Sequence, residues 1–272
     1  MKKLISLFLI FSSCAGYKLT QEAQTAIDGF DTVANAEKIL VMANTAYETP
    51  AFLFDSKKPG PAILILGGTH GNEPAGYEAA LRLLQKLQDI PPANGKVILI
   101  PLANRLSVEN YTRRVPVPKG IDREKGNLNR CYPGNADGLP MQQMAWAIEQ
   151  LVRKHDVDVF IDLHEARYLH LDTPKESIRD QGLGQTIIYY PNEPSSWLTL
   201  NMLDQINETI ENDNYHFSAI EEPILHSAAW WAGKELSIAA FTFETARILE
   251  LQQRIDWHLK LVEIVLKESD VW

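Results

Sequence analysis

The chain has 272 residues, of which 45% are hydrophobic and 22% are charged, and its formal net charge is -9. This composition is that of a globular protein with enough apolar surface for one large core. The negative charge argues against nucleic acid or anionic lipid as a general partner, because both attract basic proteins.

The N-terminus has the three-part pattern of an export signal. Two lysines precede an apolar stretch over residues 4–11, and small residues follow. The stretch is too short to span a bilayer and is typical of a secretory signal. Residues 11–14, Phe-Ser-Ser-Cys, also resemble a bacterial lipobox, with Phe at the position where Leu is usual. We therefore expect residues 1–14 to direct export, to the periplasm or to a membrane tether through lipidated Cys14, with simple secretion as the alternative.

The chain has two cysteines, Cys14 and Cys131. If Cys14 carries lipid, Cys131 has no partner for an intramolecular disulfide, even in an oxidising compartment. We interpret Cys131 as a free thiol in a loop and not as a nucleophile.

Residues 15–35 are polar and are predicted to form a tether to a single folded domain over residues 36–272. Apolar runs then predict strands at 38–43, 51–55, 62–68, 96–104, 157–164, 186–191 and 237–244. Helical spacing predicts helices at 74–88, 140–154, 197–211 and 245–268, and residues 104–140 are expected to form a long functional loop. Apolar strands that alternate with helices indicate an α/β fold, in which a mainly parallel mixed sheet is covered by helices on both faces.

Three residues with polar chemistry lie at or just beyond the carboxyl ends of predicted strands. They are His70, His164 and Glu244. In sheets of this kind ligands bind outside the carboxyl ends of the strands, where the loops converge. We therefore expect these residues to meet at one site.

The residue types at these strand ends fit a catalytic zinc ion. Such an ion takes three protein ligands from His and carboxylate groups and leaves a position open for water. His70, Glu73 and His164 supply this set, and glycines allow the sharp turn that holds the first two. Asp162 lies two residues before His164 on the same strand face, where it can orient the imidazole.

Two further segments carry chemistry. Residues 126–134 in the long loop offer Asn129 and Arg130, an amide and a guanidinium that can bind a carboxylate. Glu244 ends an otherwise apolar strand, so its carboxylate must be paired, linked to a metal or catalytic.

Four motifs in order, GGTHGNEPAG, GNLNRCYPG, DLHEA and FTFETA, resemble the succinylglutamate desuccinylase/aspartoacylase family of the zinc carboxypeptidase clan. The resemblance covers about residues 60–250 and implies a zinc carboxypeptidase-like fold. It implies that His70, Glu73 and His164 bind one zinc ion per chain. It also implies that Glu244 acts as general base toward water and then protonates the leaving amine.

The same resemblance assigns Asn129 and Arg130 to the carboxylate of the substrate. An upstream arginine in the family stabilises the oxyanion, and Arg113 in RRVP fits best, with Arg114 and Arg123 as alternatives.

The chain departs from the family pattern in two places. Asn127 stands where the family usually has Asp, which can change how the arginine loop is supported. Only 28 residues follow Glu244. We therefore expect an exported member without the C-terminal β domain that narrows the site in the named enzymes.

The aromatic segment 226–237 precedes Glu244 and is expected to be a loop that borders the substrate pocket. Trp230 and Trp231 in this segment are expected mainly to pack within the protein. His226 and Tyr168 are both candidates for substrate contact.

These observations predict a zinc-dependent hydrolase of amide bonds. Its substrates are N-acyl amino acids, or peptides cut beside a free carboxylate, so that it is a deacylase or a carboxypeptidase/murein-peptide amidase. Export favours the peptide reactions modestly. The alternative is a non-catalytic protein that binds peptide or cell-wall fragments, although such a protein has no need for Glu244. A structural zinc site needs a fourth ligand, and none has convincing spacing. No feature of the sequence indicates an oligomeric state.

Overall fold

The computed structural model describes residues 17–172 and 182–272. The predicted export signal and lipobox at residues 1–14 lie outside the described residues. Within the described part, no helix combines the length and the apolar character that crossing a membrane requires.

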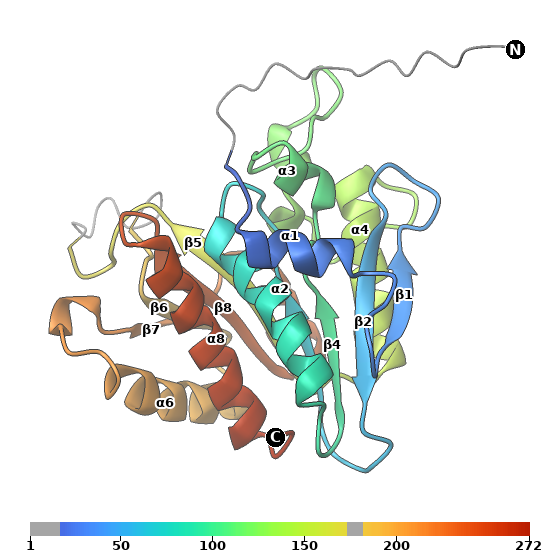
Figure 1. Cartoon of the computed structure of the whole chain (residues 1–272). Coiled ribbons are helices and arrows are strands. Elements are labelled where there is room, and N and C mark those ends of the chain that lie inside the picture. The colour runs from blue at the N-terminus through green and yellow to red at the C-terminus, as the bar shows by residue number, and fades with distance from the viewer. Residues whose placement is uncertain (1–16, 173–181) are drawn as a thin grey trace, which may run out of the picture.

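An eight-stranded sheet runs through the molecule in the order β1-β2-β4-β3-β5-β8-β6-β7 (Figure 1). Its strands are β1 (Glu37–Val41), β2 (Thr49–Asp55), β3 (Ala62–Leu66), β4 (Lys96–Ile100), β5 (Val159–Ala166), β6 (Thr186–Tyr189), β7 (Ser218–Glu221) and β8 (Ala239–Ala246). The four central strands β4, β3, β5 and β8 are mutually parallel. Strands β1, β2 and β6 pair antiparallel with a neighbour, so the sheet is mixed.

The longer helices are α1 (Gln21–Asp28), α2 (Pro74–Asp89), α4 (Pro140–Lys154), α6 (Glu193–Asn207), α7 (Ala228–Leu236) and α8 (Leu251–Glu268). The short helices are α3 (Arg105–Glu109), η1 (Arg123–Gly126), η2 (Leu128–Arg130) and η4 (Asp213–Tyr215).

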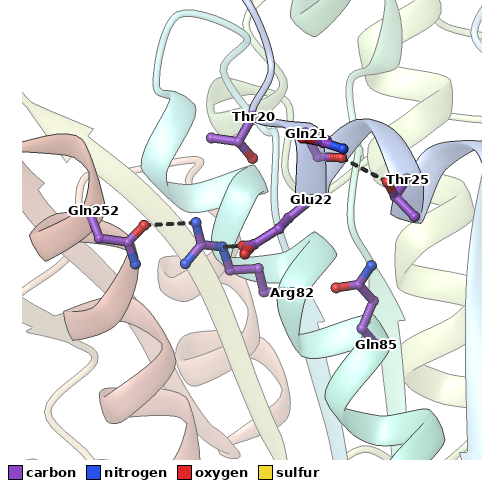
Figure 2. Close-up of a pocket in the computed structure, with 7 residues that line it drawn as sticks. All are labelled: Thr20, Gln21, Glu22, Thr25, Arg82, Gln85 and Gln252. Carbon is purple, nitrogen blue, oxygen red and sulfur yellow. Dashed lines mark hydrogen bonds and ion pairs between the residues drawn. The ribbon is translucent and has the colours of Figure 1, made fainter.

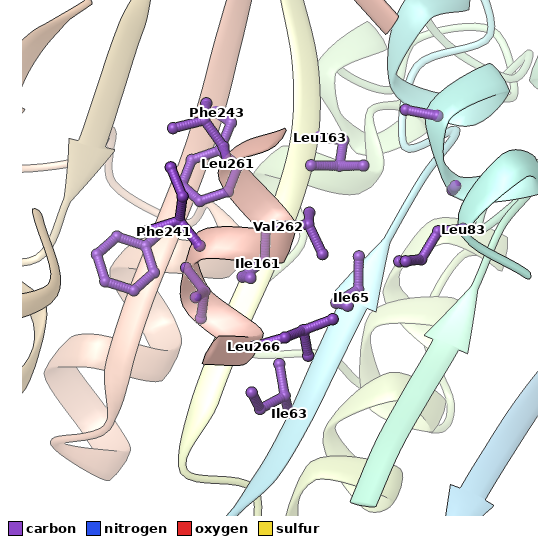
Figure 3. Close-up of a cluster of buried hydrophobic side chains, with 14 of the residues drawn as sticks. Ile63, Ile65, Leu83, Ile161, Leu163, Phe241, Phe243, Leu261, Val262 and Leu266 are labelled. Atoms are coloured by element: carbon purple, nitrogen blue, oxygen red, sulfur yellow. The ribbon is translucent and has the colours of Figure 1, made fainter. Parts of the chain in front are cut away.

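The central strands are apolar on both faces because helices cover both. Ile63 and Ile65 of β3 pack in one cluster with side chains of α2 and α8 (Figure 3). Side chains of α6 belong to the same cluster. Leu64 and Leu66, which point the other way, pack in a second cluster with side chains of α4 and α7. The predicted α/β class, with helices on both faces of a mainly parallel mixed sheet, is therefore confirmed.

The tether predicted for residues 15–35 is wrong over its described part. Helix α1 packs on α2 through the fully or nearly fully buried Ala23 and Ala26. Tyr17 and Thr20 donate hydrogen bonds to the buried carboxylate of Glu78 in α2. A short polar helix carries a weak periodic signal, and the partner that holds it lies 58 residues away.

The segment at residues 226–237 is also corrected, because most of it is helix α7 and not a loop. Ser227 caps the helix by accepting a hydrogen bond from the Trp230 amide. Trp231 is buried against Tyr132, with ring centroids 5.8 Å apart, as expected for a packing residue. The long loop at 104–140 likewise contains α3, η1 and η2.

Candidate metal centre

A tight turn between β3 and α2 carries His70 and Glu73. Gly68 adopts a φ of +70°, a backbone conformation that residues other than glycine rarely adopt. At Gly71 a Cβ atom would lie 1.9 Å from the Ser107 carbonyl oxygen, so only glycine lets the turn pack against α3. Pro74 occupies the first turn of α2, where its missing N–H costs no hydrogen bond. The turn is therefore held in one conformation by backbone packing.

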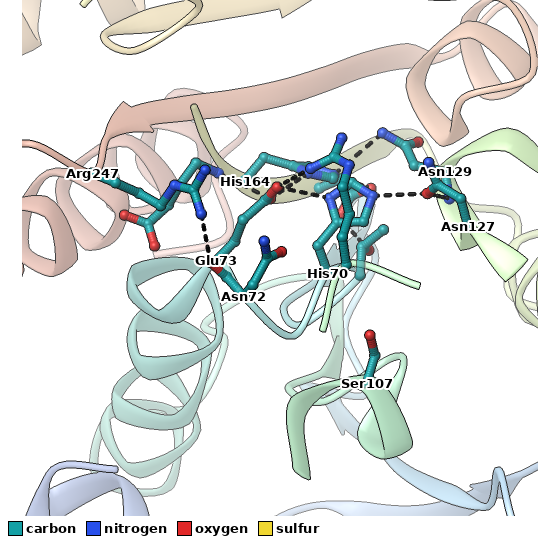
Figure 4. A network of polar contacts seen from close by, with 12 residues as sticks. His70, Asn72, Glu73, Ser107, Asn127, Asn129, His164 and Arg247 are labelled. Atoms are coloured by element: carbon teal, nitrogen blue, oxygen red, sulfur yellow. Dashed lines mark hydrogen bonds and ion pairs between the residues drawn. The ribbon is translucent and has the colours of Figure 1, made fainter. Parts of the chain in front are cut away.

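Glu73 stands at the N-cap of α2 but does not cap that helix. Its carboxylate turns instead toward the histidines, with Oε1 3.0 Å from His70 Nδ1 and Oε2 2.9 Å from His164 Nδ1 (Figure 4). Glu165, the next residue on β5 after His164, accepts a hydrogen bond from Ala75 N and so replaces the missing cap. Glu73 is thereby left free for another role.

The structure brings the three predicted ligands together. His70, Glu73 and His164 are 1–2% exposed, and one ligand atom from each lies within 4.8 Å of the others. His70 and Glu73 come from the β3–α2 turn, and His164 comes from β5, the neighbour of β3 in the sheet. This group is the candidate metal centre.

In both histidines Nδ1 faces Glu73, and Nε2 contacts a polar side chain on the side away from Glu73. His164 Nε2 lies 2.8 Å from Asp162 Oδ2, so Asp162 occupies the orienting position that the sequence predicts. His70 Nε2 lies 2.8 Å from the side-chain oxygen of Asn127. An amide oxygen only accepts, so His70 carries its proton on Nε2 and its Nδ1 is a bare acceptor.

This tautomer places two acceptors, His70 Nδ1 and Glu73 Oε1, 3.0 Å apart in a buried site. His70 Nδ1 has no hydrogen-bond donor in the structure. A buried acceptor without a donor is unfavourable, but a cation between the two acceptors satisfies both. Two imidazoles and one carboxylate form a donor set that suits zinc.

The charges of the site agree with this reading. Burial alone favours neutral Glu73, but His70, Arg113 and His164 together hold the pKa of Glu73 well below its usual range. Burial lowers the pKa of His70 to about 4, so this ligand is neutral at pH 7. Burial also opposes charge on His164, but Asp162 and Glu73 outweigh it and raise its pKa, so binding of a metal displaces a proton from this ring.

Glu244 lies beside the candidate metal centre on β8. It is the register partner of His164 in the parallel β5–β8 pair, so both side chains leave the same face of the sheet. Glu244 is 8% exposed and its Oε2 has no hydrogen-bond partner. Burial raises its pKa to about 8, and the negative charges of Glu73 and Asp162 act in the same direction.

The three candidate arginines separate in the structure. Arg113 forms an ion pair with Glu73 Oε1 and therefore lies at the candidate metal centre. Arg114 pairs instead with Glu124, and Arg123 begins η1 as an exposed residue. The position of Arg113 favours the first of the three alternatives.

Asn129 and Arg130 lie on η2, next to the histidines. Asn129 Nδ2 is 3.4 Å from His164 Nε2, and its Oδ1 accepts a hydrogen bond from Ala228 N at the start of α7. Arg130 donates a hydrogen bond to the Asn129 carbonyl and is about half-buried. Burial lowers the pKa of its guanidinium, and the negative charge of Glu244 acts in the opposite direction. Asn129 thus joins the site to α7, which the sequence did not indicate.

His226 and Tyr168 were the candidates for contact with substrate, and Trp230 was expected mainly to pack. His226 Nδ1 donates to the Tyr132 carbonyl, and the ring makes an edge contact with Trp230. Tyr168 is 39% exposed and lies two residues beyond β5. Cys131 is buried, which raises the pKa of its thiol to about 11 and agrees with its exclusion as a nucleophile.

Four contacts that support the site were not predicted from the sequence. Asn127 fixes the His70 ring, Glu165 caps α2, and Arg254 of α8 pairs with Glu165. Arg247, just beyond β8, also donates to the Asn72 carbonyl in the turn between β3 and α2, at 3.1 Å. The Asn at 127, where the family usually has Asp, was the one sequence signal for these contacts.

A polar hollow between α1, α2 and α8 contains none of the predicted site residues (Figure 2). Its Arg82 is held by Glu22 and by Gln252. The polar residues of the hollow therefore connect the helices, and they do not line the candidate metal centre.

The chain is similar to known proteins over the region of the candidate metal ligands. The sequence profile of the succinylglutamate desuccinylase/aspartoacylase catalytic domain matches residues 59–173. An N-alpha-acetyl-L-2,4-diaminobutyric acid deacetylase of Halomonas elongata is 32% identical over 105 residues, which are 39% of this chain and 28% of that protein. The sequence match thus spans little more than a quarter of this relative, and the profile match ends before Glu244.

Solved structures share the fold over most of the chain. The cell shape determinant protein Csd4 of Helicobacter pylori has a TM-score of 0.66 at 18% identity, over 87% of this chain and 55% of that one. An aspartoacylase family protein of Mesorhizobium loti has a TM-score of 0.61 at 22% identity, over 89% of this chain and 69% of that one. Over residues 59–173 the chain is therefore similar to the succinylglutamate desuccinylase/aspartoacylase catalytic domain, and over most of its length it shares the fold of these solved structures.

Proposed function

We propose that the protein is a zinc-dependent hydrolase of amide bonds. Its proposed substrates are N-acyl amino acids, or peptides cut beside a free carboxylate. One observation carries the proposal: Glu244, with an unpartnered oxygen, faces the same side of the sheet as the buried His-Glu-His group. A protein that only binds ligands has no use for a buried carboxyl group whose pKa lies near neutrality.

A zinc ion held by His70, Glu73 and His164 would polarise the scissile carbonyl and lower the pKa of water. Glu244 accepts the proton of the attacking water as the oxygen–carbon bond forms. It then returns the proton to the amine nitrogen as the carbon–nitrogen bond breaks. Burial raises the pKa of Glu244 above its usual range, and a bound cation would lower it again toward neutrality, where one carboxyl group can both accept and return a proton.

The arginines have distinct proposed roles. Arg113, beside Glu73, stabilises the negative charge that develops on the carbonyl oxygen. Arg130 binds the free carboxylate of the substrate, for which its planar guanidinium is suited. Because Arg130 belongs to η2 with Asn129, the loop that binds substrate also contacts His164.

Two substrate classes follow from the relatives. The Halomonas relative is a deacetylase of an acetylated amino acid. Csd4 is described as a D,L-carboxypeptidase and has been solved bound to mDAP and to a tripeptide. Both reactions cut an amide bond, and the tripeptide class would suit an exported enzyme.

Export and lipidation are also proposed, on the pattern of residues 1–14. Labelling cells with a palmitate analogue tests this, with Cys14→Ser as the matched variant. Label on the wild type alone supports a lipid anchor, whereas secretion without label in either chain supports simple export.

The function is tested with the soluble chain from residue 17. Bound metal is measured first, and amine release is then followed with N-acyl amino acids and with wall-type peptides. Glu244→Gln is the test variant, and Glu250→Gln, an exposed position just beyond β8, is the matched control. The proposal expects one zinc ion per chain and amine release that Glu244→Gln abolishes and Glu250→Gln preserves. Zinc without turnover would favour a binding protein, and absence of zinc would refute the site.

A further inference from the structure

The two histidines of the candidate metal centre are held by different groups. A carboxylate, Asp162, lies against Nε2 of His164, whereas an amide, Asn127, lies against Nε2 of His70. Both contacts are 2.8 Å long, and all four side chains are almost fully buried. The two contacts are equal in length, and the groups that make them differ in charge.

The orientation of the Asn127 amide is determined by its other contacts. Its Oδ1 also accepts a hydrogen bond from Asn129 N at 3.1 Å. Its Nδ2 donates to Glu124 Oε2 at 3.0 Å. A flipped amide would place its NH₂ group against the Asn129 N–H and its oxygen against the Glu124 carboxylate, so the flip is excluded.

The oxygen of Asn127 therefore faces His70, and His70 must donate from Nε2. Its Nδ1 lone pair then faces Glu73, as a metal ligand requires. A carboxylate at the same position would make the imidazole a stronger ligand, because a negative charge favours electron donation from the ring. An amide oxygen orients the ring without supplying this charge.

We propose that Asn127 is a positioning residue that fixes His70 in the Nε2-protonated tautomer and, being uncharged, keeps the metal affinity of the site below that of a carboxylate-backed pair. The proposal refines the zinc site of the proposed function and rests on it. It does not depend on hydrolysis.

The same contacts tie the metal ligand to the arginine loop. Glu124 holds Asn127 and also pairs with Arg114, and Asn127 caps η2, the helix of Arg130. His70 is thus oriented by the segment that carries the proposed substrate arginine.

The first test is the tautomer of His70 in the metal-free protein. Nitrogen-15 NMR distinguishes Nε2–H from Nδ1–H imidazoles, and comparison with His70→Gln assigns the signal. The proposal expects a neutral ring protonated on Nε2 in the wild type and loss of this preference in Asn127→Ala. An Nδ1-protonated ring in the wild type would overturn the proposal, whether or not the protein is an enzyme.

The second test exchanges the amide and the acid. Asn127→Asp alone would place the new carboxylate about 3 Å from that of Glu124. A change in zinc affinity could then arise from charge repulsion between the two acids as well as from a stronger His70 ligand. The double variant Glu124→Gln/Asn127→Asp keeps the net charge and the hydrogen bond between the two side chains but moves the acid onto His70. Glu124→Gln alone is its matched control.

Zinc dissociation constants are measured by competition with a chelator. We expect the double variant to bind zinc roughly tenfold more tightly than Glu124→Gln, and Asn127→Ala to bind at least about tenfold more weakly than wild type. Asp162→Asn, which gives His164 the amide, should also weaken binding. Equal affinity in the double variant and its control would overturn the proposal.

Discussion

Two carboxylates on neighbouring strands, Glu165 of β5 and Glu244 of β8, are both buried but have opposite surroundings. His164 and Glu165 are paired in register with Glu244 and Thr245, so the two carboxylates leave opposite faces of the sheet. Both oxygens of Glu165 are occupied, by Arg254 and by Ala75 N. Glu244 Oε2 has no partner.

This difference separates a structural carboxylate, Glu165, from the proposed catalytic one, Glu244. A fully hydrogen-bonded buried acid offsets the cost of its burial and has no capacity left for a ligand. An acid with an unpaired oxygen bears that cost in the free protein and recovers it when a proton or ligand arrives. Glu78 is a structural carboxylate like Glu165, because both of its oxygens accept hydrogen bonds, from Tyr17 and Thr20.

The largest expected effect is on turnover. Glu244→Gln should reduce kcat by about 10²–10⁴, the usual share of general base catalysis, with zinc content unchanged. Steady-state kinetics and metal analysis on the same sample check this. Turnover within a factor of about three of wild type would place Glu244 with the structural acids and remove the contrast.

On the opposite face, removal of Arg254 should act on stability. Arg254→Met leaves Glu165 buried without its cation and is expected to lower the free energy of unfolding by about 3–5 kcal/mol. Urea denaturation measures this loss. The double variant Glu165→Gln/Arg254→Met should recover part of it, because the unpaired charge is gone. No recovery would mean that Arg254 stabilises the fold by packing alone.

Glu244 should also affect stability, but in a pH-dependent way. Its pKa is raised from about 4.5 to about 8 in the folded protein, so folding favours its protonated form. The resulting stabilisation is complete below pH 4.5. It is lost as the pH rises from 4.5 through 8, because the unfolded chain ionises in this range before the folded protein does.

Metal-free Glu244→Gln has no such group. It should be more stable than metal-free wild type at pH 9, by on the order of 1–3 kcal/mol, and about equal near pH 4.5. Thermal or urea unfolding at both pH values tests this. A constant difference at all pH values would show that the glutamine effect does not arise from ionisation.

The smallest effect is expected at the rim of the site. Arg130→Ala should lower kcat/KM about 10- to 100-fold for substrates with a free carboxylate, since it removes a hydrogen bond between charged groups. Amidated analogues should change little. Equal losses on both substrates would mean that Arg130 supports η2 and does not contact substrate.

The contrast between the two acids was only partly visible in the sequence. Glu244 was identified because a carboxylate that ends an apolar strand needs an explanation. Glu165 lies in the equally informative segment DLHEA, yet its cap on α2 depends on a contact with a residue 90 positions away. Arg254 could not be connected to it, because a helical pattern shows which face is apolar but not which strand residue meets it.

The predicted strands and helices were close to those observed where their patterns were strong. The predictions failed for α1 and α7, and β7 was missed. Helix α1 is short and polar, β7 has only four residues, and α7 has aromatic residues that suit several structures. Each of these elements is held mainly by tertiary contacts, such as that of Asn129 with the start of α7.

The sequence by itself indicated which polar groups meet at the candidate metal centre. The alternation of strands and helices places His70, His164 and Glu244 at strand ends on one side of a sheet, because parallel strands end together. The tertiary structure alone decided which arginine meets Glu73, which group orients His70, and which buried acid is left unpaired. These outcomes depend on distances between segments far apart in the chain, and local periodicity does not encode such distances.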